Sequence, residues 1–152
     1  MVLSSDGGEA MRATLVGQIQ AWLDDPESSV EYAEELEGRW AVRMRQQTRD
    51  ATTVWFTVGE RSLGYEAFVI PLPPGSGRVA EQALTRNQRT WRAHFAIDVE
   101  GDLVLRGRLP EAQVSSGELE LALGEIYETI EVSFRPLLAA LAEDAKNPVR
   151  NL

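Results

Sequence analysis

The side chains with the clearest chemical potential are arginines that recur along the segments expected to form strands. Lys146 is the only lysine, so arginine carries nearly all of the positive charge. A guanidinium group binds carboxylates through paired, planar hydrogen bonds and stacks on aromatic rings. If the strands pair as their spacing indicates, an acidic peptide could dock on one sheet face that carries Arg39, Arg43, Arg45, Arg92, Arg106 and Arg108. The alternative interpretation is a solvated face whose arginines pair with nearby glutamates.

A second candidate is the glycine-containing segment Gly75–Ala80, which has the form G-x-G-x-x-A between a predicted strand and a predicted helix. In dinucleotide-binding proteins such a loop lets phosphate approach a helix N-terminus. That fold needs parallel strands, whereas the segment 91–98 turns directly into an antiparallel partner. Pro73 and Pro74 also oppose a tight turn into the glycines. Nucleotide binding at Gly75–Ala80 is therefore the alternative function, and a proline–glycine loop is the structural interpretation.

The sequence offers no recognisable catalytic set. His94 is the only histidine and cysteine is absent, so Ser115 and Ser116 lack an evident base and are better explained as helix caps. Three acidic residues near a predicted turn lack the spacing of a calcium-binding loop, namely Asp98, Glu100 and Asp102. We predict that the protein is not an enzyme and has no catalytic, cofactor-binding or metal-binding residues.

Composition narrows the class of protein further. The 152 residues suit one domain, and the formal net charge of −9 opposes sequence-independent binding of nucleic acid. Neither long predicted helix has the basic residues of a DNA-recognition helix. No apolar run is long enough to cross a bilayer, no segment is of signal type, and the absence of cysteine fits a reducing compartment. We predict a cytoplasmic protein without nucleic-acid or membrane partners.

Periodic apolar residues predict three helices. The first spans 7–24, with Asp6 and Glu9 as a capping box and Pro26 beyond its end. A short helix over 77–88 follows the proline–glycine loop. The last helix spans 115–143, begins with a capping box at Ser115–Glu118, and is expected to kink or divide near 132–135 because of Pro136. Its glutamates are expected to form a solvated face, namely Glu118, Glu120, Glu125, Glu128 and Glu131.

Alternating apolar residues predict two groups of strands. A three-strand meander spans 39–72, and an antiparallel hairpin spans 91–109 with its turn at Glu100–Gly101. The hairpin should bury one face made of Trp91, Ala93, Phe95, Ile97, Leu103, Leu105 and Leu109. The secondary structure of the acidic segment 27–37 is ambiguous. We interpret it as a loop with a helical turn at 32–36. Residues 146–152 are expected to form a frayed tail.

The chain resembles a known bacterial family over nearly its whole length, and the matching motifs lie in the run from about Ala80 to Leu141. The resemblance is carried by Ala83-Leu84…Asn87, by Phe95-Ala-Ile-Asp98…Gly101-Asp-Leu-Val-Leu-Arg-Gly-Arg-Leu-Pro110, by Ser115…Glu118-Leu119…Ala122-Leu123, and by the helix ending at Leu137-Leu138. These features are similar to those of the YbjN-like family of sensory transduction regulators. The resemblance implies one domain over 1–152 with the order α-β-β-β-α-β-β-α, as in type III secretion chaperones, which are usually dimers. It brings no catalytic residues.

These observations together predict an α+β protein that acts without catalysis. We expect a protein-binding module, either chaperone-like or a regulatory adaptor, that binds a segment of a partner protein and forms a homodimer. The predicted partner-binding residues are Arg43, Arg45, Arg92, Arg106 and Arg108. Apolar residues off the main stripe of the last helix belong either to a dimer contact or to a broad core, namely Leu121, Tyr127 and Leu138.

Overall fold

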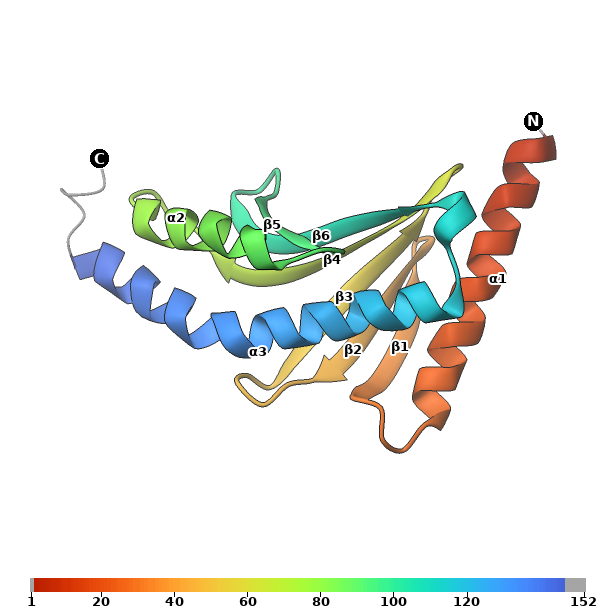
Figure 1. The fold of residues 1–152 in the computed structure, drawn as a ribbon, viewed down its shortest axis with the longest axis horizontal. Helices are drawn as coiled ribbons and strands as arrows, with labels where there is room; N and C mark the ends of the chain where they lie inside the picture. Colours follow the sequence, from red (N-terminus) through yellow and green to blue (C-terminus); the bar gives the residue numbers. More distant parts are fainter. Residues whose placement is uncertain (1, 147–152) are drawn as a thin grey trace.

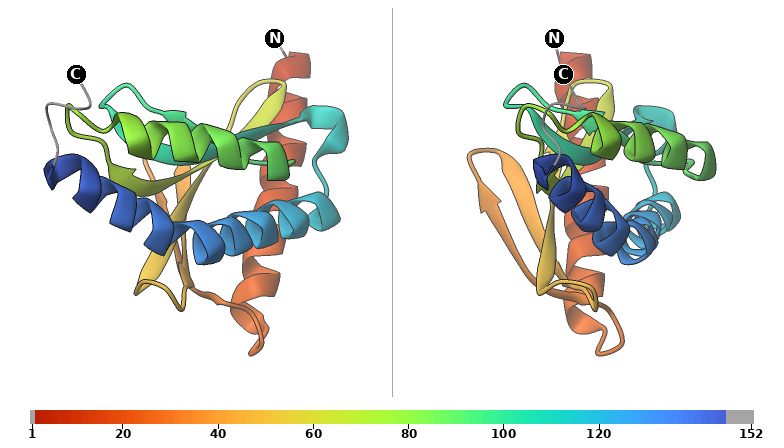
Figure 2. Two further views of the ribbon diagram at one scale, coloured as in Figure 1. Left: turned by 60° about the vertical axis from the view of Figure 1, so that its left-hand side comes forward. Right: turned by 90° about the vertical axis from the view of Figure 1, so that its left-hand side faces the viewer.

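The computed structural model describes residues 2–146, with side chains from residue 7 onward. One antiparallel sheet forms one layer and three helices form the other (Figure 1). The helices are α1 (Val2–Asp24), α2 (Gly77–Arg86) and α3 (Ser116–Lys146). The right-hand view of Figure 2 shows the hairpin of β1 (Val30–Leu36) and β2 (Arg39–Arg45) in orange on one side of the molecule and α2 and α3 on the other.

The sheet has six strands in the order β1-β2-β3-β4-β6-β5. Their bounds are β1 Val30–Leu36, β2 Arg39–Arg45, β3 Ala51–Val58, β4 Ser62–Pro71, β5 His94–Ile97 and β6 Asp102–Pro110. All neighbouring strands run antiparallel. The predicted α+β class, antiparallel sheet and terminal helices are confirmed, and the predicted order lacked one strand.

The core lies between the sheet and the helices. Alternate residues of the strands point toward the helices, and Val42, Val54 and Leu105 are fully buried there. The helices contribute residues at spacings of three and four, such as Leu15 of α1 and Ile126 of α3. Each buried side chain of this size stabilises the fold by about 1.5–3 kcal/mol relative to an exposed one. Within residues 2–146, no helix covers the opposite side of the sheet (Figure 2).

The missed strand is β1, in the acidic segment that the sequence assigned to a loop and a helical turn. Only Val30 of this edge strand is buried, so its own residues carry little of the alternation that marks a strand. Its pairing with β2 supplies the stability instead. The turn between them places Glu37 at φ 52° and Gly38 at φ 80°, which is the geometry of a two-residue hairpin.

The helices differ from the predictions at several points, and α2 ends at Arg86, two residues before its predicted end. Helix α1 already begins at Val2, so Asp6 lies within the helix and does not cap it. Helix α3 is continuous from Ser116 to Lys146 with Pro136 inside it, and its ribbon bends partway along (Figures 1 and 2). The helix therefore bends without dividing. Of the predicted tail 146–152, Lys146 ends α3, and residues 147–152 lie outside the described residues.

The predicted hairpin 91–109 forms with a shorter first strand. Ala93 and Phe95 are buried as expected, but Trp91 is 80% exposed and Ile97 is 57% exposed. Strand β5 begins only at His94, after a segment that α3 holds in place. The side chain of Asn87 pairs with the outer edge of β5, because it donates to the Phe95 carbonyl and accepts from the Phe95 N–H. This contact closes part of an edge that would otherwise be free to pair with another chain.

Candidate functional site

The side of the sheet without helices, here called the open face, gathers most of the predicted arginines. Strand register places Arg39, Arg43 and Arg45 of β2 on this face, together with Arg106 and Arg108 of β6. All five are exposed. The face also carries acidic residues of β1 and β4, namely Glu31, Glu34 and Glu66. Its arginines outnumber these acids, although the whole chain has a formal net charge of −9.

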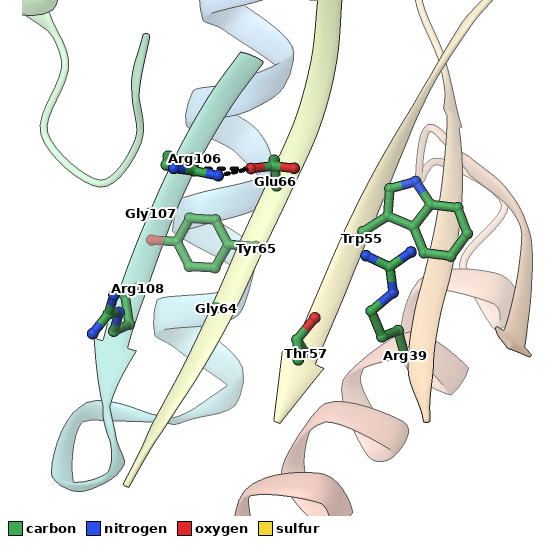
Figure 3. A pocket seen from close by; sticks show the side chains of 9 residues that line it. All are labelled: Arg39, Trp55, Thr57, Gly64, Tyr65, Glu66, Arg106, Gly107 and Arg108. Carbon is green, nitrogen blue, oxygen red and sulfur yellow. Dashed lines mark hydrogen bonds and ion pairs between the residues drawn. The ribbon is translucent and has the colours of Figure 1, made fainter. Parts of the chain in front are cut away.

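The centre of the open face is hollowed where β3, β4 and β6 lie side by side (Figure 3). This depression, here called the Gly64 hollow, has a volume of about 520 Å³. It is lined by Arg39, Trp55, Thr57, Gly64, Tyr65, Glu66, Arg106, Gly107 and Arg108. Gly64 faces outward, and a Cβ added there would meet only the Gly107 carbonyl oxygen, at 3.9 Å. The hollow therefore exists because no side chain covers the sheet at this position.

Three of the arginines on the open face are neutralised within the protein. Arg43 donates to Glu31 at 3.1 Å, and Arg45 lies 3.9 Å from the same carboxylate. Arg106 forms an ion pair with Glu66 on the neighbouring strand. For these three, the structure agrees with the alternative interpretation in which arginines pair with nearby glutamates.

The other two arginines have no such neutralising partner. Among the side chains that the structure describes, those of residues 7–146, no carboxylate lies within ion-pair distance of Arg39 or Arg108. The Arg39 guanidinium lies over the Trp55 ring, 4.4 Å from the ring centroid, as expected of a cation–π contact. Arg39 and Arg108 lie on opposite sides of the Gly64 hollow (Figure 3). On the open face they are the two arginines most available to an external carboxylate.

Large apolar side chains are also exposed on the open face. Tyr32 and Leu36 of β1 are 53% and 41% exposed, and Phe68 of β4 is 47% exposed. Phe68 lies at a register shift between β4 and β6. Arg49 supports this irregularity by donating to the carbonyl oxygens of Phe68 and Val69 at 2.7 and 2.8 Å. The face therefore offers apolar contacts beside its positive charge.

Arg92 does not join the other predicted residues. It lies in the segment before β5, where its guanidinium binds Glu118 of α3 at 2.9 Å. Its carbonyl oxygen accepts a hydrogen bond from the Tyr65 hydroxyl at 2.7 Å. Burial raises the pKa of Tyr65 to about 12, with a further contribution from Glu125, so this hydroxyl remains a donor at neutral pH. Arg92 belongs to the contact between sheet and helix, because the segment ahead of β5 turns toward α3.

Of the five glutamates expected to form a solvated face on α3, four bind other groups of the protein instead. Glu118 binds Arg92, and Glu120 accepts from the Trp22 indole at 2.6 Å. One oxygen of Glu125 accepts from three successive backbone N–H groups at 2.7–3.0 Å, those of residues 91–93. Only Glu128 stays exposed without a specific hydrogen bond within the described part of the chain. The glutamates of α3 thus hold neighbouring segments against the helix through hydrogen bonds.

Glu131 binds the turn between β2 and β3 through hydrogen bonds in the same way. It accepts from the backbone N–H of Gln47 at 2.8 Å and also binds Gln46 and Thr48. Burial alone would raise the pKa of Glu131, but these hydrogen bonds outweigh burial and hold the pKa below its ordinary value. The carboxylate therefore stays ionised at neutral pH and keeps its acceptor role.

The Gly75–Ala80 loop leads into α2 as predicted, with Gly75 at φ 87°. Segment 91–98 pairs antiparallel with the following strand β6, as predicted, but this pairing does not exclude a crossover. Strands β4 and β5 are both antiparallel to β6 and therefore parallel to each other, with β6 between them. However, the buried Asp144 carboxylate of α3 accepts from the Val79 N–H at 3.1 Å, and it lies 3.7 Å from Arg78. A nucleotide phosphate at this helix N-terminus would meet a carboxylate, which disfavours phosphate binding.

The remaining sequence candidates occupy ordinary positions. His94 is exposed on β5, and Asp98 accepts from the N–H groups of Glu100 and Asp102 within the hairpin turn. Across the described residues, no cluster of three or more acidic, histidine or cysteine side chains could hold a metal ion. No helix in the same part of the chain is both long and apolar enough to cross a membrane. On α3, Leu121 and Leu138 are exposed, whereas Tyr127 packs partly against the core.

The fold belongs to a class seen among type III secretion chaperones. A chain of the solved HopA1–SchA chaperone–effector complex superposes with a TM-score of 0.55 at 12% identity, covering 82% of this chain and 92% of that one. The structure of the Yersinia pestis type III secretion chaperone SycH, in complex with a stable fragment of YscM2, gives a TM-score of 0.51 at 15% identity. That match covers 78% of this chain and 97% of the other. At these identities the likeness shows the fold alone.

The chain belongs to the YbjN family, whose model matches residues 16–139 and is described as "Putative bacterial sensory transduction regulator". It is 33% identical over 101 residues to an uncharacterized protein of Mycobacterium leprae (strain TN), covering 66% of this chain and 55% of that protein. An uncharacterized protein of Mycobacterium tuberculosis (strain H37Rv) is 32% identical over 83 residues, covering 54% and 45%. The chain spans about half the length of the curated relatives it matches.

Proposed function

We propose that this protein is a non-enzymatic binding module whose open face holds an acidic segment of a partner protein. The observation that carries the proposal is the concentration of exposed arginine and aromatic side chains on the open face, which no helix of the described part of the chain covers. Opposite charge steers such a partner onto the face, and exposed apolar side chains add contact area. The fold supports this proposal because two chains of similar fold come from complexes of a chaperone with another protein.

The proposal extends the family description to a chaperone-like or adaptor role in regulation. A bound segment would lie across the strands, where Tyr32, Leu36 and Phe68 offer apolar contacts and Arg39 and Arg108 offer charge. We also propose a homodimer in the cytoplasm, with the exposed Leu121 and Leu138 of α3 as candidate contacts. Light scattering of the purified protein measures the oligomeric state directly.

Charge reversal on the open face is expected to abolish partner binding. The double variant Arg106→Glu/Arg108→Glu replaces two exposed positive groups of β6 by negative ones, so an acidic segment is repelled. Affinity capture from cells of the source bacterium, quantified by mass spectrometry, should show a specific partner depleted about tenfold or more in the variant.

The matched control is Arg86→Glu/Arg89→Glu, which makes the same change in net charge at the far end of α2. The control should capture the partner as well as the unaltered protein does. Equal capture by all three proteins, or a loss confined to the α2 control, would contradict binding at the open face.

A further inference from the structure

A single row of residues crosses the open face through the Gly64 hollow. Strand register pairs Arg39 with Thr57, Thr57 with Gly64, and Gly64 with Arg108. The row thus begins and ends with an arginine, and the residues between them are short or lack a side chain. Figure 3 shows Arg39 and Arg108 on either side of Gly64 and Thr57.

The two arginines of the row differ from the other arginines of the open face. Arg43, Arg45 and Arg106 already lie close to Glu31 or Glu66, so a ligand carboxylate would have to compete for them. Within the described residues, Arg39 and Arg108 have no ion-pair partner. A ligand therefore gains most by placing one carboxylate at each end of the row.

The distance between Arg39 and Arg108 determines how far apart two acidic residues of a ligand must lie. Arg39 and Arg108 are separated by three strand-to-strand intervals, about 14 Å at the usual 4.8 Å per interval. An extended peptide rises about 3.4 Å per residue, so side chains at positions i and i+4 lie at nearly the same separation. Residues i, i+2 and i+4 also project from the same side of an extended segment. Acidic residues four apart therefore match the two arginines.

The middle of the row accepts a side chain between the two acids. Gly64 leaves the floor open, and Trp55 forms a wall beneath the Arg39 guanidinium. A side chain at i+2 would enter the hollow over Gly64 and lie beside the Trp55 ring. An apolar side chain suits this position, because it gains contact with the ring and leaves no buried polar group unpaired.

We propose that the Gly64 hollow binds an extended segment with the pattern acidic–x–apolar–x–acidic, which crosses the sheet from β2 to β6. Its two carboxylates bind Arg39 and Arg108, and its central side chain fills the hollow. The proposal rests on the proposed function and adds the chemistry and spacing that the partner segment must have.

The test is an NMR titration of the ¹⁵N-labelled full chain with a capped peptide, acetyl-Glu-Thr-Leu-Thr-Glu-amide. The expected result is a saturable shift of the Thr57, Gly64 and Gly107 amides and of the Trp55 indole N–H. Raising the salt concentration should weaken binding, because the contacts are exposed ion pairs. Moving the second glutamate to i+3, or replacing both glutamates by lysine, should weaken it about fivefold or more.

Two variants separate the row from the rest of the open face. Arg108→Gln removes one end of the row, and Gly64→Val fills the hollow with a side chain for which the backbone has room. Each should weaken peptide binding about threefold or more, while Arg89→Gln, at an exposed arginine beyond α2, should leave it unchanged. Circular dichroism and thermal unfolding show whether each variant keeps its fold.

Shifts that map to the helices, or binding that is indifferent to acid spacing and to both variants, would overturn the proposal. So would the absence of saturable shifts. These failures are distinguishable from failure of the proposed function. If cellular capture is lost on charge reversal of β6 while the spaced peptide binds no better than its controls, the open face binds a partner by another pattern.

Discussion

Replacement of Gly107 by alanine is expected to lower the free energy of unfolding by about 3 kcal/mol or more. Gly107 lies on β6 where the segment before β5 passes close to the sheet. A Cβ added there would lie 2.0 Å from the Arg92 carbonyl oxygen and 2.5 Å from the Tyr65 ring. Neither group moves easily, because the Tyr65 hydroxyl donates to that carbonyl and Glu125 binds the backbone of the same segment.

Urea unfolding followed by circular dichroism measures this effect, and Gly64→Ala is the matched control. Gly64 is a strand glycine of the same sheet, but a Cβ there meets nothing closer than 3.9 Å. The free energy of unfolding of the control should lie within about 1 kcal/mol of that of the unaltered protein. Similar stabilities for the two variants would contradict the close approach of the Arg92 carbonyl and the Tyr65 ring to Gly107.

Replacement of Arg49 by alanine is expected to cost about 3 kcal/mol of stability, because hydrogen bonds from a charged donor to partly buried carbonyls are lost. Arg49 donates to the carbonyls of Phe68 and Val69 and to the Thr52 hydroxyl, and it lies over the Phe134 ring. Burial lowers its pKa, yet arginine remains charged at any ordinary pH.

Arg49→Lys provides the comparison for this prediction. Lysine keeps the charge but lacks the planar fork that reaches two carbonyls and a hydroxyl at once, so about half of the loss should remain. Urea unfolding measures the free energy of unfolding of the unaltered protein, Arg49→Ala and Arg49→Lys. Full stability in both variants would mean that Arg49 does not hold the register shift at Phe68.

Most of the sheet could be predicted because its strands bury alternate residues. β2, β3 and β4 each place apolar side chains on the core side, and that pattern is visible without a structure. β1 could not be found in this way, since only Val30 is buried and five of its seven residues are exposed, three of them glutamates. The Glu37–Gly38 turn before a clear strand was the available signal.

The candidate site was predictable in part. Alternation placed Arg43, Arg45, Arg106 and Arg108 on one face, because side chains two apart in a strand share a side. It could not show which arginines are neutralised, since the Glu31 and Glu66 pairings depend on strand register. The hollow was missed for the same reason. Only register brings Gly64 between Thr57 and Arg108.

The hydrogen-bond partners of the glutamates on α3 could not be predicted from the sequence of that helix alone. The spacing of the glutamates predicts a solvated face, and the helix itself contains nothing that contradicts it. Glu125 and Glu131 instead bind backbone N–H groups of the segment before β5 and of the β2–β3 turn. Those donors become available only when the loops reach the helix, so no pattern within α3 could reveal them.

The most direct test of partner binding at the open face is site-specific photo-crosslinking in living cells. A photoreactive phenylalanine analogue in place of Thr57 lies at the Gly64 hollow, and the same group in place of the exposed Thr85 lies on α2 as control. The proposed function predicts a crosslink from position 57 to an acidic segment of one protein, and its loss when Arg39 and Arg108 are replaced by glutamate. Crosslinks from position 85 alone, or a crosslink at 57 that survives these replacements, would contradict it.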